Sequence, residues 1–310
     1  MVRMNCKSSD AHFHRITINL LRFCAISTII LVLAGCQTIK MAKPFSAEHV
    51  LPDTDSMYLK IPVEKNKAIC SSIISSYIVG LTEKDCSELV ERSETIFASI
   101  DFSQKSINAA VVGEFPVFMD MVFTKKNGWE TRKYDKGGHS VKYYVSLGSG
   151  FQIAVLERSV MLVSSSDVQV LLNNHFAYDD ALETTEVPVV QDDVSVDSRF
   201  NRKFVLTNKS ADISFYTSKA GSFIESIIGN GITLAADEAA GTFEKQTENE
   251  YVLDMEMTFT NKHALKPALF LFKKAQPSGQ VETEALSELS MKCTGMTMDI
   301  KTIVSLLIGG

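Results

Sequence analysis

Apolar and polar residues alternate along much of the chain at the periods of strands and helices. In the segment 56–61, Met57 and Leu59 alternate with polar neighbours, which is the pattern of a strand buried on one face. Apolar residues recur at helical spacing over 65–79 and again over 83–93. The same criteria predict strands at 93–101, 106–115, 128–134, 140–147, 150–157 and 159–165, and helices at 116–123 and 168–176. The first half of the chain is therefore expected to mix helices with antiparallel strands.

The second half of the chain repeats this order of elements. The segment 179–198 holds seven acids and no base, which indicates a linker or an acidic edge. Beyond it, a strand, a helix, a strand pair and an apolar helix return at 212–218, 221–229, 241–259 and 261–275. We therefore expect an α+β protein of two related β-α-β-β-α modules with largely antiparallel sheets, at 52–178 and 199–310, with 179–198 between them.

The N-terminal 35 residues have the pattern of an export signal. Basic residues precede an uncharged run of 12 residues at 23–34. A transmembrane helix needs about 20 apolar residues, and extending the run to Ile16 places Arg22 inside it, at a cost of a few kcal/mol. The run therefore fits the apolar core of a signal peptide. A membrane span is the alternative.

The end of this run, Leu33-Ala34-Gly35-Cys36, resembles the lipobox of bacterial lipoproteins. The resemblance covers only the leader. It implies that the Cys36 thiol receives a diacylglyceryl group, that a signal peptidase removes residues 1–35, and that the new N-terminus is acylated. Residues 36–51 would then be a lipidated tether. The alternative is an ordinary secretory leader with an incidental cysteine.

Composition narrows the classes of partner. The chain has 310 residues, 45% hydrophobic and 22% charged, which suffices for a buried core. From Cys36 onward it has 27 basic and 36 acidic residues, a formal charge of −9. A nucleic-acid partner is not expected, because such proteins carry basic patches. Attraction to anionic headgroups is disfavoured for the same reason. The expected partners are the membrane, through the lipid on Cys36, and an envelope protein.

Cysteine and histidine positions indicate no redox or metal site. After Cys36 the chain has only Cys70, Cys86 and Cys293, without the C-x-x-C spacing of such sites. Cys70 and Cys86 lie on two predicted helices. They are expected either to form a disulfide in an oxidising compartment or to remain buried free thiols. No metal, no catalytic residue and no cofactor other than the covalent lipid is predicted.

Two predicted helices carry Phe and Met side chains that suit an apolar groove. These are Phe118 and Met121 in 116–123, and Phe270 and Phe272 in 261–275. Met and Phe adapt to lipid-like or peptide ligands. The alternative is that both apolar faces are buried as core.

The sequence thus predicts a lipid-anchored protein of the bacterial cell envelope. With Gln37 after the cysteine, the expected place is the outer membrane, facing the periplasm or the surface. The expected role is a non-catalytic binding or structural module. The alternative is a carrier of an apolar ligand, and an envelope enzyme ranks last because no catalytic constellation can be named.

Overall fold

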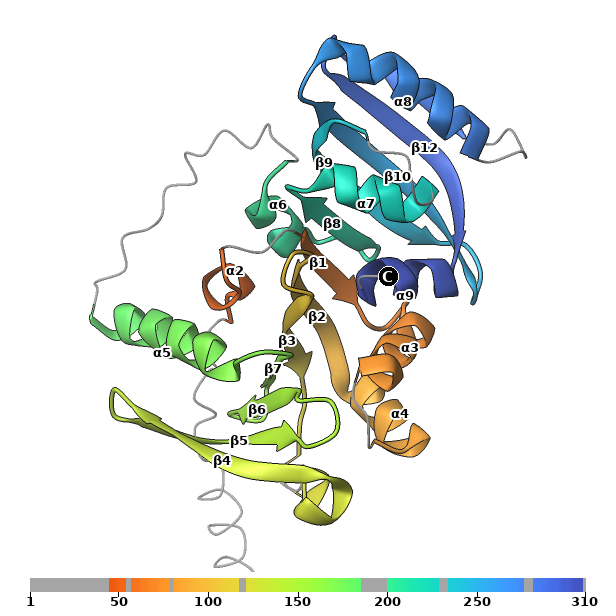
Figure 1. Cartoon of the computed structure of the whole chain (residues 1–310). Coiled ribbons are helices and arrows are strands. Elements are labelled where there is room, and N and C mark those ends of the chain that lie inside the picture. The colour runs from red at the N-terminus through yellow and green to blue at the C-terminus, as the bar shows by residue number, and fades with distance from the viewer. Residues whose placement is uncertain are drawn as a thin grey trace, which may run out of the picture. The chain divides into compact units, whose positions relative to one another are not determined.

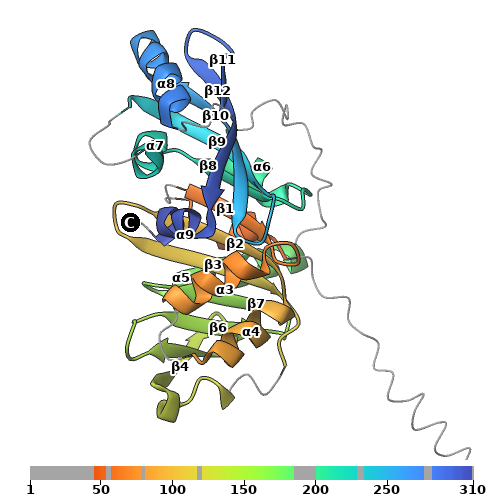
Figure 2. The same ribbon diagram turned by 90° about the vertical axis from the view of Figure 1, so that its right-hand side faces the viewer.

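A computed structural model describes residues 45–53, 57–77, 81–116, 121–184, 200–228, 234–275 and 281–308 (Figures 1 and 2). The chain from Phe45 onward forms one compact unit. All sequence-based expectations for Met1–Pro44, the lipobox included, lie outside the described residues.

The unit is built on one large antiparallel sheet. Within the described residues twelve strands follow the order β11-β12-β10-β9-β8-β1-β2-β3-β7-β6-β5-β4, and every neighbouring pair is antiparallel. The first half of the chain gives β1 (Met57–Pro62), β2 (Ser93–Asp101), β3 (Ser106–Gly113), β4 (Trp129–Lys136), β5 (His139–Ser146), β6 (Gln152–Leu156) and β7 (Val160–Ser164). The second half gives β8 (Ile213–Thr217), β9 (Ala236–Lys245), β10 (Glu250–Phe259), β11 (Glu282–Ala285) and β12 (Ser290–Asp299). The expected α+β class with a largely antiparallel sheet is confirmed.

Helices cover both faces of this sheet. One face carries α3 (Lys67–Tyr77), α4 (Glu83–Arg92), α7 (Ala220–Ile228), α8 (Lys262–Ala275) and α9 (Ile300–Ile308), whose apolar residues share one core with the strands. The opposite face carries α2 (Ala47–Val50), α5 (Val168–Thr184) and α6 (Arg202–Thr207), over two smaller clusters. Figure 1 shows α3, α4 and α9 on one side of β1 and β2, with α2, α5 and α6 on the other. A short 3-10 turn, η2 (Lys125–Asn127), precedes β4.

Alternation along each strand explains how one sheet serves two cores. In β1, Met57 and Leu59 enter the large core under α3, whereas Tyr58 between them packs with α2 and α6. In β3, Ala109 and Val111 enter the large core, and Ala110 packs with α5. Successive side chains of a strand point to opposite faces, so the period-two pattern read from the sequence is the burial pattern of the sheet.

The two halves of the chain join through β1 and β8. These strands pair over Met57–Lys60, with Leu59 opposite Phe215. The side chain of Arg202 on α6 reinforces this junction. It contacts Asp53 at 2.8 Å, donates to the carbonyl oxygen of Glu48 at 2.9 Å and lies over the Tyr58 ring at 5.6 Å. Arg202 of the second half thus holds residues 48–53, which precede β1, against the sheet.

Several elements differ from the sequence-based expectations. The expected tether at 36–51 overlaps packed residues, because Val50 and Leu51 are buried. Residues 179–184 continue α5 instead of starting a linker, and Asp180 within them contacts His139 at 3.1 Å. The short elements α2, α6 and β11 were not predicted. Residues 185–199, and residues 117–120 of the expected helix at 116–123, lie outside the described residues.

Among the described residues, no helix is both long enough and apolar enough to cross a membrane.

Candidate functional site

The cysteines predicted as a possible bridge are free thiols. Cys70, Cys86 and Cys293 are all unpaired and buried, so the disulfide alternative does not hold in this structure. Burial raises the pKa of both Cys70 and Cys293 to about 12. Burial also raises the pKa of Cys86, and the nearby carboxylate of Asp85 adds to this effect. A thiol is reactive as a thiolate, and these three are therefore held in the unreactive form.

The apolar residues predicted to line one groove lie apart. Phe272 is buried in the large core under α8, whereas Phe270 on the same helix is 58% exposed, with the Lys274 amine 4.7 Å from its ring centroid. Met121 is 75% exposed and precedes η2, which contacts the edge strand β4. The α8 helix contacts β10, β11 and β12 at the opposite end of the sheet. Phe118 lies outside the described residues, and the structure does not bring Met121 and Phe270 together.

An apolar cavity of about 90 Å³ lies instead between the α3–α4 pair and the sheet. It exists because Ala98 on β2 stands directly opposite Ala109 on β3, where the adjacent strand positions carry larger aliphatic side chains. Its lining is almost wholly hydrophobic and comprises Leu59, Ile61, Ile73, Ile74, Leu89, Ser93, Ile96, Ala98, Ile100, Ile107, Ala109, Val111, Phe151, Met161 and Val163. Such a cavity has affinity only for an apolar group.

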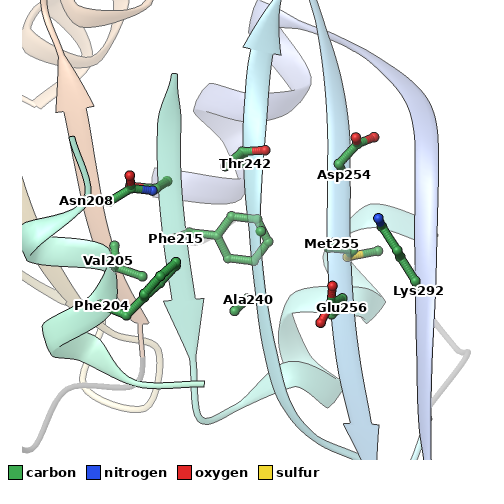
Figure 3. Close-up of a pocket in the computed structure, with 12 residues that line it drawn as sticks. Phe204, Val205, Asn208, Phe215, Ala240, Thr242, Asp254, Met255, Glu256 and Lys292 are labelled. Carbon is green, nitrogen blue, oxygen red and sulfur yellow. The ribbon is translucent and has the colours of Figure 1, made fainter. Parts of the chain in front are cut away.

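A second, polar pocket of about 290 Å³ lies on the opposite face of the sheet, beside α6 (Figure 3). Its lining comprises Phe204, Val205, Asn208, Ser214, Phe215, Ala240, Gly241, Thr242, Asp254, Met255, Glu256 and Lys292. The short side chain of Ala240 creates the hollow, because its cross-strand partners are the much longer Tyr216 on β8 and Glu256 on β10. The wall on one side is α6, and β10 and β12 form the other side.

Charged groups gather on the β10–β12 side of this polar pocket. Glu256 is the direct cross-strand partner of Lys292, and Figure 3 shows Lys292 reaching from β12 toward β10. Asp254 lies two residues before Glu256 and therefore on the same face. One Asp254 oxygen accepts a hydrogen bond from the backbone N–H of Gly295 at 2.9 Å. Gly295 has a φ of 79° at the irregularity where β10 and β12 change register, so Asp254 also stabilises this bulge.

The base of the polar pocket holds a buried hydroxyl. Ser214 is 2% exposed, and its Oγ has no hydrogen-bond partner within the described residues. Its neighbours Ile213 and Phe215 enter the core on the other face, so the Ser214 hydroxyl faces the pocket side, next to its cross-strand partner Thr242. A buried polar group without a partner is costly, and native structures rarely retain one without a reason.

Neither hollow was predicted from the sequence, although some of the residues that form them stand out in the strand patterns. Alanines within predicted strands mark places where a side chain leaves space, as at Ala109 and Ala240. Asp254 and Glu256 alternate with apolar residues along a predicted strand, which indicates a polar face. The registers that place Ala98 against Ala109, and Ala240 against Glu256, join separate strands and cannot be obtained from local pattern.

Three histidines that are far apart in the sequence meet at α5. His49 stacks on Tyr178, and His139 stacks on Phe176 and contacts Asp180 at 3.1 Å. His175 lies on α5 itself, 3.7 Å from Asp179. These contacts give the histidines a packing role. In the part of the chain that the structure describes, no group of three or more His, Cys, Asp or Glu side chains is arranged to hold a metal ion.

Comparisons with known protein families and with solved structures point to the same protein family. The family described as outer membrane-associated lipoprotein TP0453 matches residues 42–288. Crystal form I of TP0453 superimposes with a TM-score of 0.65 at 14% identity, covering 86% of this chain and 98% of that one. Crystal form III superimposes with a TM-score of 0.63 at 15% identity, covering 86% of this chain and 99% of that one. Crystal form IV superimposes with a TM-score of 0.56 at 16% identity, covering 84% of this chain and 96% of that one. No curated protein sequence matches.

Proposed function

Because the chain belongs to the TP0453 family of outer membrane-associated lipoproteins, we propose that it is held at the outer membrane by lipid on Cys36 and acts as a non-catalytic binding module. The family match carries this proposal. The motif Leu33-Ala34-Gly35-Cys36 supports it independently, because the match begins at residue 42, after the motif. An envelope lipoprotein whose chain from Cys36 onward has a charge of −9 needs such an anchor, since electrostatic attraction to anionic lipid is unfavourable.

The mechanism that we propose is tethering. Two or more acyl chains exceed what stable anchoring requires, and confinement beside the membrane raises the effective concentration of the module toward its partners there. The described unit begins at Phe45, and Arg202 holds α2 against the sheet. The tether would therefore comprise only the residues between Cys36 and Phe45.

Crosslinking in intact cells tests the binding role. A photoreactive residue placed in turn at Met121, Leu147, Phe270 and Leu289, all large and exposed, is expected to give discrete adducts with envelope proteins. Tethering predicts that these adducts weaken strongly in a Cys36→Ala background, because the module is no longer concentrated at the membrane. Absence of protein adducts at all four positions, or adducts of equal yield without the anchor, would contradict the proposal.

A carrier of an apolar ligand is the second candidate, and the cavity between α3–α4 and the sheet favours it. Its volume of about 90 Å³ is well below the roughly 300 Å³ of small-molecule sites. An acyl chain would enter only if the helix pair moved away from the strands. For this reason the carrier function ranks second.

Mass spectrometry of gently extracted full-length protein separates the two candidates. The binding-module proposal predicts no stoichiometric non-covalent lipid. The carrier predicts such lipid, together with its loss on Ala109→Leu, which fills the cavity, and its retention on Ala285→Leu at an exposed position of β11. Lipid that survives Ala109→Leu would be bound elsewhere and would count against the cavity.

We also propose that the chain consists of two related modules. The order of strands in the sheet supports this idea. From the central β1–β8 pair, the sheet continues toward one edge as β1-β2-β3-β7 and toward the other edge as β8-β9-β10-β12, so the strands of each half follow one another in the same order. In each half one long strand pair follows the first helical segment, as β2 with β3 and β9 with β10.

A further inference from the structure

We propose that copies of this chain associate through α8, whose basic outer face docks on the acidic sheet face of a second copy. Both surfaces belong to the second half of the chain, and they lie on opposite faces of the same strands. The contact joins folded parts and does not depend on the lipid anchor. It rests on opposite charge, on one exposed aromatic side chain and on the hollow beside α6.

The outer face of α8 carries cations and no acid. Leu265, Ala268 and Phe272 of this helix are buried in the large core. Its lysines are all exposed, and within the described residues none of them forms an ion pair: Lys262, Lys266, Lys273 and Lys274. Like charges four residues apart, as at Lys262 and Lys266, destabilise a helix. In a chain with a formal charge of −9 from Cys36 onward, this basic face indicates an anionic partner.

The other face of the same strands is acidic and lacks a helical cover. The apolar clusters on that face include no residue of β10, β11 or β12, and Figure 2 shows α7 and α8 beside the opposite face. Within the described strands β9 to β12 this face has one base, Lys292, against the acids Glu238, Glu244, Asp254, Glu256, Glu282 and Glu284. Glu244, Glu282 and Glu284 are exposed and form no ion pair within the described residues. The acidic sheet face therefore offers unneutralised carboxylates to a basic surface.

Phe270 provides an apolar anchor at the centre of the basic face. Its side chain is 58% exposed. Lys266 and Lys274 lie one turn before and after it, and the Lys274 amine is 4.7 Å from its ring centroid. An exposed aromatic ring among charged side chains is the usual composition of a binding hot spot and its rim.

The hollow beside α6 is a place where this ring can enter. It opens on the acidic sheet face at Ala240, has a volume of about 290 Å³ and is bounded on the α6 side by the partly exposed Phe204. Asp254 and Glu256 stand on the β10 side of the hollow (Figure 3). A Phe270 ring in the hollow would contact Ala240 and Phe204, while the neighbouring ammonium groups would approach the carboxylates.

The two surfaces also agree in size. The 14 residues of α8 span about 21 Å. The ten-residue strands β10 and β12 are about 34 Å long, and the three spacings from β9 to β11 add up to about 14 Å. Because each copy would use α8 toward one neighbour and the sheet toward another, the contact is heterologous and extends into rings or chains.

A second copy accounts for both surfaces, whereas other partners account for one. An anionic lipid surface would attract the lysines of α8 but would leave the acidic sheet face without a partner. A metal ion is not indicated, since no group of three or more metal-ligating side chains occurs among the described residues. We therefore commit to a second copy as the occupant.

Sedimentation of the full-length protein in an excess of neutral detergent micelles tests the association. We expect the mass to rise with protein concentration, and raising the salt concentration from about 0.05 M to about 0.5 M to weaken association about tenfold or more, because salt screens the charges. Phe270→Ala should weaken it about tenfold or more, as expected for loss of a buried anchor. The control is Met121→Ala, which removes a side chain that is 75% exposed near the opposite edge of the sheet. It should leave the mass unchanged.

Two variants that each keep one surface test the geometry. One replaces Lys266, Lys273 and Lys274 with Gln, and the other replaces Glu244, Glu282 and Glu284 with Gln. All six side chains are exposed, so both variants are expected to fold. Each alone should associate about tenfold or more weakly than wild type. Their equimolar mixture should form one-to-one pairs, because the intact α8 of one variant meets the intact sheet face of the other.

A carbodiimide, which couples amines to carboxylates in contact, identifies the surfaces. In the mixture it should join lysines of α8 to carboxylates of β9–β12 on the other copy. Monomeric wild type, wild-type association in Phe270→Ala, or a mixture that does not pair would overturn the proposal. Wild-type protein that stays monomeric but binds anionic vesicles through the α8 lysines would also overturn it, with lipid as the occupant.

Discussion

Replacing Cys36 with alanine is expected to abolish labelling by an acyl-chain probe and to release the protein from the membrane fraction. The reason is chemical, because alanine lacks the thiol that would carry the diacylglyceryl group. It is also energetic, since each buried methylene contributes about 0.8 kcal/mol to membrane binding. Without the lipid, a chain with a charge of −9 from Cys36 onward has no attraction to anionic headgroups.

The chain contains a matched control in Cys24, which lies within the apolar run of the leader. Cys24→Ala should keep full acyl labelling and full membrane association, because this cysteine lies upstream of the expected cleavage site. Metabolic labelling followed by separation of the membranes measures both effects. Label that persists in Cys36→Ala, or membrane association that is unchanged, would disprove the anchor and favour the alternative of a spanning segment.

The strands and most helices could be predicted from the sequence, because their pattern is local. The β10 strand alternates buried Tyr251 and Leu253 with partly exposed Val252 and Asp254, and the period-two reading recovers it. In contrast, β11 has the sequence Glu-Thr-Glu-Ala, with no buried apolar residue to mark it. It is a strand because it pairs with β12, which is a long-range contact.

The candidate sites could be predicted only in part, for the same reason. Cys36 could be named as the anchor from the sequence because its motif is contiguous, and it stays a prediction. The polar pocket depends on Ala240 meeting Glu256 and Tyr216 across two registers, and on α6, which has only six residues. The groove expected from Phe270 and Met121 was not assembled, because their elements lie at opposite ends of the sheet. The apolar residues of a helix indicate which kinds of group it can contact, but the order of strands in the sheet decides which groups lie next to it.

Replacing Phe215 with alanine is expected to lower the free energy of unfolding by about 3–5 kcal/mol and to do so for both halves of the chain. Phe215 is fully buried on β8, where its ring centroid lies 4.9 Å from that of Phe223 and 5.3 Å from that of Phe243. On the β1 side it pairs with Leu59. A cavity at this position weakens the core of the second half and the strand pair that joins the halves.

The single tryptophan makes this expectation testable. Trp129 is buried on β4, at the opposite edge of the first half, with its ring 4.9 Å from Phe123. Its fluorescence therefore reports unfolding of the first half alone, whereas far-ultraviolet circular dichroism reports the whole unit. In urea, Phe215→Ala should move both transitions to the same lower midpoint, because the sheet is continuous through β1 and β8.

The control is Phe270→Ala, the same substitution in the same half at a side chain that is 58% exposed. It should change the free energy of unfolding by no more than about 0.5 kcal/mol, and the two urea midpoints should therefore stay almost unchanged. If the two halves were independent modules joined only by a linker, Phe215→Ala would leave the Trp129 transition in place and split the dichroism curve into two steps. Coincident transitions would mean that the β1–β8 pair makes one cooperative unit of the two halves.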